Sequence, residues 1–180
     1  MSPTAILGDA WELYKTHWRT FAPLALIVYL ILGAVALVLT LLLGWLGAII
    51  SALISIVGTF WLQGALVEAV QDVRDGRQDL TIGELFRRVQ PRLPAIISAG
   101  ILAAIGIFIG LILLIVPGLF LLTIWSLIIP VIVLEGKSAG ESFARSRELV
   151  RGNGWNVFGV IAITVGLTIA ANIMVAIATF

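Results

Sequence analysis

This chain contains few residues of the types that catalyse reactions or bind metals, and they do not form a recognisable catalytic set. His17 is the only histidine, and cysteine is absent, which excludes disulfides, thiolate metal ligands and thiol catalysis. A metal site at His17 would lack further histidine or cysteine ligands. The sequence contains neither a Ser-His-Asp set nor a Gly-rich phosphate loop followed by Lys. We therefore predict a protein that is not an enzyme and that holds no metal and no cofactor.

Two carboxylates, Glu68 and Glu135, stand where long apolar stretches end. An acid at the C-terminal end of a helix opposes the helix dipole, so each should have a basic partner. The candidates are Arg74 and Arg88 for Glu68, and Arg145 and Lys137 for Glu135. We interpret them as structural ion pairs that hold surface helices against the ends of spanning helices. The alternative is a proton- or ion-coupled role, but neither acid lies at mid-membrane, where ionisable groups are functional candidates.

Polar residues also recur inside one apolar stretch, where Ser51, Ser55, Thr59 and Gln63 follow one another at four-residue steps. This spacing places them on one helix face, which we expect to point into the protein. They could line a transport path, or they could form hydrogen bonds between helices, each worth about 0.6 kcal/mol. Two groups of small residues favour packing, because they allow helices to approach closely. These groups are Ala99, Ala103, Gly106 and Gly110, and Ala162, Gly166 and Ala170.

The composition identifies the environment of these residues as a membrane. Of the 180 residues, 61% are hydrophobic and 12% are charged, and the mean hydropathy is +1.14. A soluble domain carries about 25% charged residues, so this apolar surplus must face lipid. The net charge is only +1 and the basic residues form no nucleic-acid face, which argues against a nucleic-acid partner.

The apolar stretches predict an all-α protein with five transmembrane helices. A bilayer core about 30 Å thick requires about 20 helical residues. Residues 21–67 and 94–134 are each about twice that length, whereas residues 155–180 suffice for one span. We expect breaks at Gly44-Trp45-Leu46-Gly47, giving helices near 21–43 and 46–68, and at Pro117-Gly118. Pro130 should kink the fourth span.

The basic residues all lie outside these stretches and on one side of the predicted topology. They are Lys15 and Arg19; Arg74, Arg77, Arg87, Arg88 and Arg92; and Lys137, Arg145, Arg147 and Arg151. The two predicted tight turns carry no charge. The positive-inside rule therefore makes the basic side cytoplasmic and places the N-terminus in the cytoplasm.

The segments between the spans have the spacing of amphipathic helices that lie in the membrane interface. In the first, Leu7 and the aromatic anchors Trp11, Tyr14 and Trp18 recur at helical spacing. The second groups Ile82, Leu85, Phe86 and Val89, and the third groups Ala139, Phe143, Leu149 and Val150. These helices either sense or dock at the membrane surface, or simply connect the spans that they precede; the second interpretation is the more common one.

The three surface helices begin with similar residues, which indicates an internal repeat. Gly8-Asp9, Gly83-Glu84 and Gly140-Glu141 are each followed two places later by an aromatic residue. An acid in the first turn favours a helix start. We infer a pseudo-threefold repeat of a surface helix plus a helical hairpin, in one membrane domain with units of about 4–70, 80–134 and 138–180. The third unit lacks its second span, so either the sequence is part of a six-helix protein or a partner supplies the last helix.

The third unit carries one further pattern. Trp125, Pro130 and Glu135 are followed by Arg145-Ser146 and by Leu149-Val150-Arg151-Gly152 before the next span. Roughly residues 117–158 thereby resemble the membrane domain attached to some bacterial glycerophosphodiester phosphodiesterases, and its stand-alone multi-span relatives of unknown function. The resemblance implies a six-helix domain of the bacterial inner membrane. It implies no catalysis, since the phosphodiesterase reaction belongs to a separate soluble barrel that nothing here resembles.

These observations favour a non-catalytic integral membrane module that binds lipid or a partner protein at the cytoplasmic face. Its expected partners are membrane lipids, and a membrane protein or a second copy of the chain is possible. The alternative is a small transporter or channel component that uses the polar face of Ser51, Ser55, Thr59 and Gln63.

Overall fold

The computed structural model describes residues 2–76 and 80–178, and the regular structure within these ranges is entirely helical. The elements are α1 (Pro3–Leu43), α2 (Trp45–Arg74), α3 (Ile82–Val89), the 3₁₀-helix η1 (Gln90–Arg92), α4 (Leu93–Leu113), α5 (Ile115–Ile124), α6 (Ile128–Glu135), α7 (Ala139–Val150) and α8 (Gly154–Ala178). Five helical segments are long and apolar enough to cross a membrane. They are Pro3–Leu43, Trp45–Arg74, Ile82–Leu113, Ile115–Glu135 and Gly154–Ile177. The predicted all-α fold is confirmed for the described residues, and so is the number of helices that are long and apolar enough to span a membrane.

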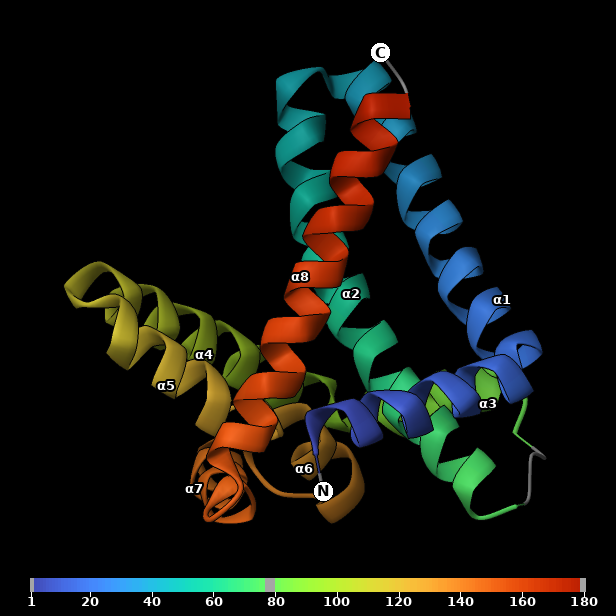
Figure 1. The fold of residues 1–180 in the computed structure, drawn as a ribbon. Helices are drawn as coiled ribbons and strands as arrows, with labels where there is room; N and C mark the ends of the chain where they lie inside the picture. Colours follow the sequence, from blue (N-terminus) through green and yellow to red (C-terminus); the bar gives the residue numbers. More distant parts are fainter. Residues whose placement is uncertain (1, 77–79, 179–180) are drawn as a thin grey trace.

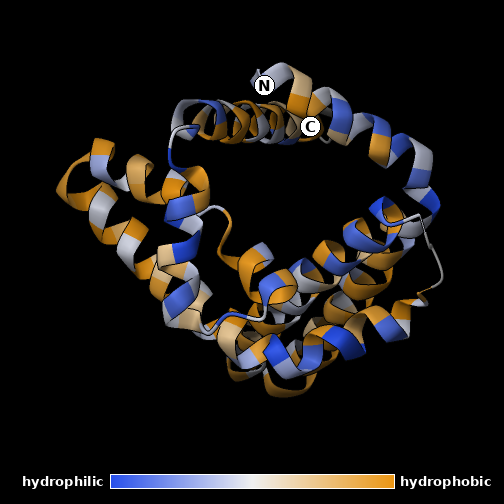
Figure 2. Ribbon diagram, turned by 90° about the horizontal axis from the view of Figure 1, so that it is seen from below, coloured by the Kyte–Doolittle hydropathy of each residue, from blue (hydrophilic) through white to orange (hydrophobic). Residues whose placement is uncertain are grey.

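The spanning helices form two hairpins and one single helix (Figure 1). The α1–α2 hairpin and α8 rise together in this view, whereas the α4–α5 hairpin diverges to the left. The short helices α3, α6 and α7 and the first part of α1 lie together at the lower end of the view. Seen from below, these lower segments carry most of the hydrophilic residues, and the hairpins behind them are mainly hydrophobic (Figure 2).

The predicted first surface helix and first span are one helix, α1, which bends at His17. This residue has non-helical backbone angles, φ −119° and ψ 26°. The Nδ1 atom of His17 lies 3.2 Å from the carbonyl oxygen of Leu13. The helix begins earlier than the Gly8-Asp9 motif predicts, because Ser2 caps it and Pro3 occupies its first position, two strong signals for a helix start.

The first predicted break is confirmed and the second is wrong in position. Gly44 separates α1 from α2 with φ 58°, a backbone conformation that glycine adopts without steric cost. The second hairpin instead turns at Leu114, which is extended (φ −162°, ψ 136°). Pro117 is the third residue of α5, and the first turn of a helix does not use its backbone N–H groups. A proline there starts a helix rather than ending one.

The fourth span is broken, as Pro130 predicts. Residues 125–127 separate α5 from α6, and Pro130 is the third residue of α6. A proline ring collides with the carbonyl group four residues earlier in a regular helix. Here that carbonyl belongs to Ser126, which lies in the break.

Buried side chains concentrate at the lower end of the molecule. One cluster joins α1, α2 and α3 around Leu24, Ala65 and Leu85, and a second joins α3, α4 and α6 around Val89, Ile96 and Ile132. In contrast, the turn of the α1–α2 hairpin is open, with Leu41 76% exposed and Leu42 75% exposed. The protein therefore packs mainly at one end and presents apolar surface elsewhere.

The small residues of α4 allow close packing against α5. A Cβ atom added at Gly106 would lie 2.7 Å from the Trp125 ring, and one added at Gly110 would lie 3.0 Å from the Cα atom of Gly118. The corresponding face of α8 behaves differently: Ala162, Gly166 and Ala170 are all exposed. The close-approach face predicted there has no helix against it in the described chain.

We expect Gly118→Val to destabilise the protein by about 1–3 kcal/mol, as overpacking generally does. A Cβ atom at Gly118 would lie 2.6 Å from the backbone nitrogen of Leu111, which cannot move aside without displacing α4. The matched control is Gly166→Val on α8, because nothing lies within 4 Å of a Cβ atom added there. Thermal unfolding in detergent measures both. Equal melting temperatures of the two variants would contradict the close α4–α5 contact.

Candidate functional site

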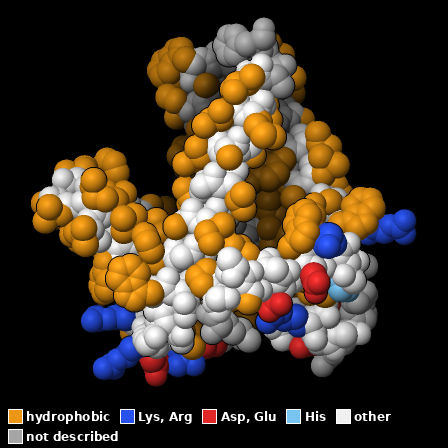
Figure 3. Space-filling model, viewed as in Figure 1, with side chains coloured by type: hydrophobic (Ala, Val, Ile, Leu, Met, Phe, Trp, Pro, Cys, Tyr) orange, Lys and Arg blue, Asp and Glu red, His pale blue; other side chains and the backbone are white. Residues whose placement is uncertain are grey.

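The charged residues gather at one end of the molecule, which we call the charged end. It consists of the first part of α1, the last turns of α2, and α3, η1, α6 and α7. In Figure 3 all coloured charges lie on this lower part, and the surface above is apolar or uncharged. Arg77 lies outside the described residues. Because this end also holds most of the buried side chains, it is the most closely packed part of the molecule and the candidate for a binding site.

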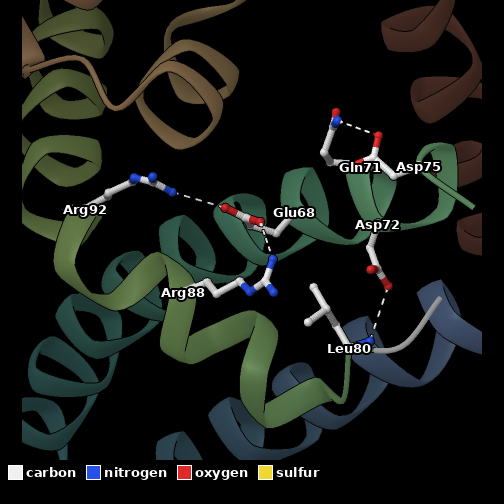
Figure 4. A network of polar contacts seen from close by, with 7 residues as sticks. All are labelled: Glu68, Gln71, Asp72, Asp75, Leu80, Arg88 and Arg92. Atoms are coloured by element: carbon white, nitrogen blue, oxygen red, sulfur yellow. Dashed lines mark hydrogen bonds and ion pairs between the residues drawn. The ribbon is translucent and has the colours of Figure 1, made fainter. Parts of the chain in front are cut away.

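At the first of two junctions between a spanning helix and a surface helix, that of α2 with α3 and η1, two arginines form ion pairs with Glu68. Its residue is only 9% exposed. One carboxylate oxygen accepts a hydrogen bond from Arg92 at 3.1 Å, and the other lies 3.9 Å from Arg88 (Figure 4). The pair of guanidinium groups thus compensates a nearly buried negative charge at the end of α2.

The structure brings Glu68 to Arg88 as the sequence analysis proposes, but not to Arg74. Arg74 follows Glu68 by six residues in the same helix, which places it about 240° around the helix axis. Arg92 was missed. Its signal is its position four residues after Arg88, a spacing that puts two side chains on one helical face.

An aromatic contact accompanies this ion pair. The Trp61 indole Nε1 donates a hydrogen bond of 3.0 Å to the backbone carbonyl of Phe86. The two rings meet edge to face, with centroids 5.4 Å apart and an interplanar angle of 88°, a favoured aromatic geometry. Nearby, Asp72 accepts the backbone N–H of Leu80 at 3.4 Å (Figure 4). These contacts fasten α3 to the end of α2.

The second junction repeats this arrangement between α6 and α7. Arg145 donates from Nε to both oxygens of Glu135, at 2.9 and 3.1 Å, and from Nη1 to Glu148 at 2.8 Å. The hydrogen bond to Glu148, and then that to Glu135, raises the pKa of the Arg145 guanidinium. Trp125 and Phe143 meet edge to face, with centroids 5.0 Å apart and an interplanar angle of 83°. The other candidate, Lys137, is not the partner of Glu135 in these ion pairs.

Both surface helices are capped in the same way. Thr81 and Ser138 are the N-caps of α3 and α7, and each exchanges hydrogen bonds with a glutamate three residues later, Glu84 or Glu141. Counted from the cap, Phe86 and Phe143 stand at the fifth position, and Arg88 and Arg145 at the seventh. The helices that meet the ends of α2 and α6 therefore share cap, aromatic ring and cation at identical spacing.

The capping glutamate of α7 is held in its ionised form. Hydrogen bonds from the Ser138 side chain and backbone lower the pKa of Glu141; desolvation opposes this shift and Lys137 adds to it. Because the folded state favours the carboxylate, this contribution to stability is present above the ordinary pKa of 4.5 and is lost as the pH falls through the lowered value.

A buried hydroxyl group, which the sequence analysis did not single out, bridges the break in the fourth span. Ser146 of α7 is fully buried. It donates to the carbonyl of Ile124 at 2.7 Å and accepts from the backbone N–H of Leu127 at 3.1 Å. Irregular backbone at membrane depth is tolerated where such groups satisfy it. The signal for this role is the serine beside Arg145, combined with a proline that breaks the preceding span.

The polar residues of α2 do not share one environment. Ser51 is buried and donates to the carbonyl of Ala48 at 3.0 Å; Ser55 and Thr59 are half-buried, and Gln63 is exposed. The expected inward direction therefore fails at Gln63. A step of four residues turns about 40° around an α-helix, so three steps turn the side chain by about 120°.

The aromatic anchors lie exposed on α1. Trp11, Tyr14 and Trp18 are 59%, 44% and 52% exposed. Trp11 and Tyr14 stack with centroids 5.9 Å apart, Lys15 lies over the Trp11 ring and Arg19 lies over the Trp18 ring. The two tryptophan rings therefore each have a basic side chain next to an exposed apolar surface.

Two concave regions adjoin the charged end. A groove of about 650 Å³ between α1 and α2 has almost wholly apolar walls and ends at Trp61 and Phe86. A second pocket of about 560 Å³ lies beside α7, between Ile124, Arg147 and Arg151. Neither is lined by the polar residues of α2.

No metal site is found, because no three His, Asp or Glu side chains within residues 2–76 and 80–178 gather closely enough to hold an ion. No family model, curated protein or solved structure matches this chain. The resemblance of residues 117–158 to a phosphodiesterase-associated membrane domain therefore stays a prediction. The site has to be interpreted from its own geometry, which offers ion pairs, aromatic contacts and pockets.

Glu68→Gln should lower stability by about 1–3 kcal/mol, because it leaves two guanidinium groups without their counter-charge. Glu135→Gln should have a smaller effect, since its side chain is 32% exposed and Arg145 keeps Glu148. Glu12→Gln is the control, because Glu12 is exposed and forms no ion pair within the described residues. Thermal melting in detergent ranks the three. Unchanged melting of Glu68→Gln would rule out the structural role of this ion pair.

Ser146→Ala should destabilise the protein by about 1–3 kcal/mol, the cost of leaving buried polar groups unpaired. Ser142→Ala is a close control, because Ser142 lies in the same helix and is fully buried, yet it donates only to the carbonyl of Ala139 in its own first turn. The comparison uses the same thermal assay. Equal losses for the two variants would show that Ser146 does not stabilise the broken span.

Ser138→Ala should lower the melting temperature at neutral pH, since it removes the cap of α7 and the main cause of the lowered Glu141 pKa. The difference from the unaltered protein should stay constant above pH 4.5 and shrink below it, as Glu141 becomes protonated. Melting curves over an acidic pH series test this. A difference that grows on acidification would have the wrong sign for a depressed carboxyl pKa.

Proposed function

We propose that this chain is a non-catalytic integral membrane module that binds lipid at its charged end. In this proposal it is a multi-pass protein of the bacterial cytoplasmic membrane with its N-terminus in the cytoplasm. The observation that carries the proposal is the one-sided charge: the described basic side chains lie on the first part of α1, at the end of α2, and on the surface helices and connecting segments next to the apolar spans. Basic residues accumulate on the cytoplasmic side of membrane proteins, where anionic headgroups attract them.

The first part of α1 supports a position in the membrane interface. Trp11, Tyr14 and Trp18 are exposed to the surroundings, and such amphipathic rings concentrate at headgroup depth. Lys15 and Arg19 beside these rings supply charge for lipid phosphates. We infer that this segment is an amphipathic interfacial helix that anchors the charged end to the bilayer surface.

The apolar groove between α1 and α2 supports lipid contact at greater depth. Ile27, Ile31, Leu53 and Val57 are among its walls, and all are exposed on the described chain. A surface of this kind in a membrane is suited to acyl chains. Headgroups at the charged end and chains in such grooves together fit a lipid-binding module.

A second candidate function is the docking of a membrane partner or of a second copy of the chain. The observation that favours it is the bare face of α8, where Ala162, Gly166 and Ala170 are exposed, because small residues permit close helix contacts. The two similar junctions of α3 and α7 support the repeat of a surface helix plus hairpin. In this interpretation, a helix of the partner would pack against this face of α8.

Native mass spectrometry distinguishes the two candidates. The protein is released from nanodiscs that contain equal amounts of phosphatidylcholine and phosphatidylglycerol, with no other lipid. Lipid binding predicts one or more retained lipids at fixed stoichiometry, enriched in phosphatidylglycerol. A fixed homo-oligomer without retained lipid would favour docking between copies. A bare monomer, or retained lipid in the same ratio as the nanodisc, would contradict the lipid-binding function.

A further inference from the structure

The pocket beside α7 combines an apolar wall with two cations. Its volume is about 560 Å³, within the range of about 300–1,000 Å³ that is common for ligand sites. Phe120 and Ile124 of α5 form one side, and Arg147, Arg151 and Gly152 form the other. The α5 residues belong to the segment Ile115–Glu135, which is apolar enough to span a membrane, whereas the arginines lie on the surface helix and its cap.

The two arginines have no acidic counter-charge in the part of the chain that the structure describes. Arg147 and Arg151 are four residues apart, which puts them on the same side of α7, and both are exposed. Neither forms an ion pair with an acid of residues 2–76 or 80–178. Like charges at this spacing destabilise a helix. An anion between the two guanidinium groups would offset that repulsion.

The acidic residue that lines the pocket, Glu148, already has a basic partner. Its carboxylate accepts a hydrogen bond of 2.8 Å from Arg145. Arg145 is in turn fixed by Glu135. The junction between α6 and α7 therefore engages the acidic residue that lines the pocket beside Arg147 and Arg151.

The backbone that lines the pocket beside the arginines is open. Gly152 has φ 86°, a conformation that side chains rarely adopt, and it turns the chain from α7 into α8. A Cβ atom added at Gly152 or at Gly154 would meet nothing within 4 Å. The turn thus leaves room beside the arginines for a group larger than a single small ion.

We infer that this pocket binds an anionic phospholipid, with its phosphate between Arg147 and Arg151 and an acyl chain along Phe120 and Ile124. This inference rests on the proposed lipid-binding function and deepens it by naming the site and the lipid class. Guanidinium groups form paired hydrogen bonds with phosphate oxygens. The apolar wall selects an acylated ligand over free phosphate, and the cations select an anionic over a zwitterionic headgroup.

The test compares two charge-matched double variants of the full chain in detergent. Arg147→Gln with Arg151→Gln alters the pocket; Arg74→Gln with Arg87→Gln removes the same charge elsewhere. Thermal shift is recorded against dioleoyl-phosphatidylglycerol, dioleoyl-phosphatidylcholine and inorganic phosphate, each over a concentration series. We expect phosphatidylglycerol to stabilise the unaltered protein and the control, with an apparent affinity at least about tenfold weaker in the pocket variant. Phosphatidylcholine and inorganic phosphate should stabilise none of them comparably.

The outcomes separate the site from the function. If phosphatidylglycerol stabilises all three proteins equally, lipid binding stands and the pocket is the wrong site. If the control variant loses as much affinity as the pocket variant, binding follows net charge and the inference is overturned. Stabilisation by inorganic phosphate alone would assign the arginines to a free anion. If no lipid stabilises the unaltered protein, both the site and the proposed function fail.

Phe120→Ser tests the apolar wall with the same assay. Phe120 is 55% exposed, so the substitution leaves the core intact. Weaker stabilisation by dioleoyl-phosphatidylglycerol in this variant supports an acyl chain along α5. Unchanged stabilisation would contradict that part of the inference.

Discussion

A charged side chain at the centre of a bilayer costs about 3 kcal/mol even on a favourable scale, and the rest of this structure depends on that constraint. Because every Lys and Arg lies outside the apolar stretches, the segments that carry them must gather where the spans leave the membrane. The short helices α3, η1 and α7, the end of α2 and the first part of α1 do so at one end (Figure 1). The main buried clusters lie there too, so the protein is held together at its charged end, and much of the remaining spanning surface is apolar and exposed.

The two junctions at that end show how a spanning helix and a surface helix are fastened. In each junction a tryptophan of the span packs against a phenylalanine of the surface helix. A glutamate near the end of the span forms an ion pair with the arginine that follows this phenylalanine by two residues. Within each junction, the aromatic contact lies toward the apolar span and the ion pair lies toward the charged end. Each junction therefore crosses the boundary between the two environments. Arg147 and Arg151 have no acidic partner within the described part of the chain, which is the basis of the proposed lipid site.

Hydropathy and turn residues predicted the spans, because both act locally. Gly44 marks its turn by backbone freedom, and Pro130 breaks its helix through a clash within one turn. The second turn was placed wrongly at Pro117, because a proline that ends one helix and a proline that starts another look alike in sequence. Arg92 and Ser146 could not be assigned, since their partners Glu68 and Ile124 lie more than twenty residues away. Those contacts depend on how α3 and α7 fold back onto the spans, which local sequence does not determine.

We propose that the charged end faces the cytoplasm, where anionic headgroups are available to it. The chain has no cysteine, so one introduced thiol reports one position. Gly140→Cys lies on α7, where a Cβ atom has open space, and Leu42→Cys lies near the turn of the α1–α2 hairpin, 75% exposed. The measurement is labelling of each variant by a membrane-impermeant maleimide, in intact bacterial cells and after permeabilisation. A cytoplasmic charged end predicts labelling of Gly140→Cys only after permeabilisation and of Leu42→Cys in intact cells. Labelling of Gly140→Cys in intact cells would contradict it.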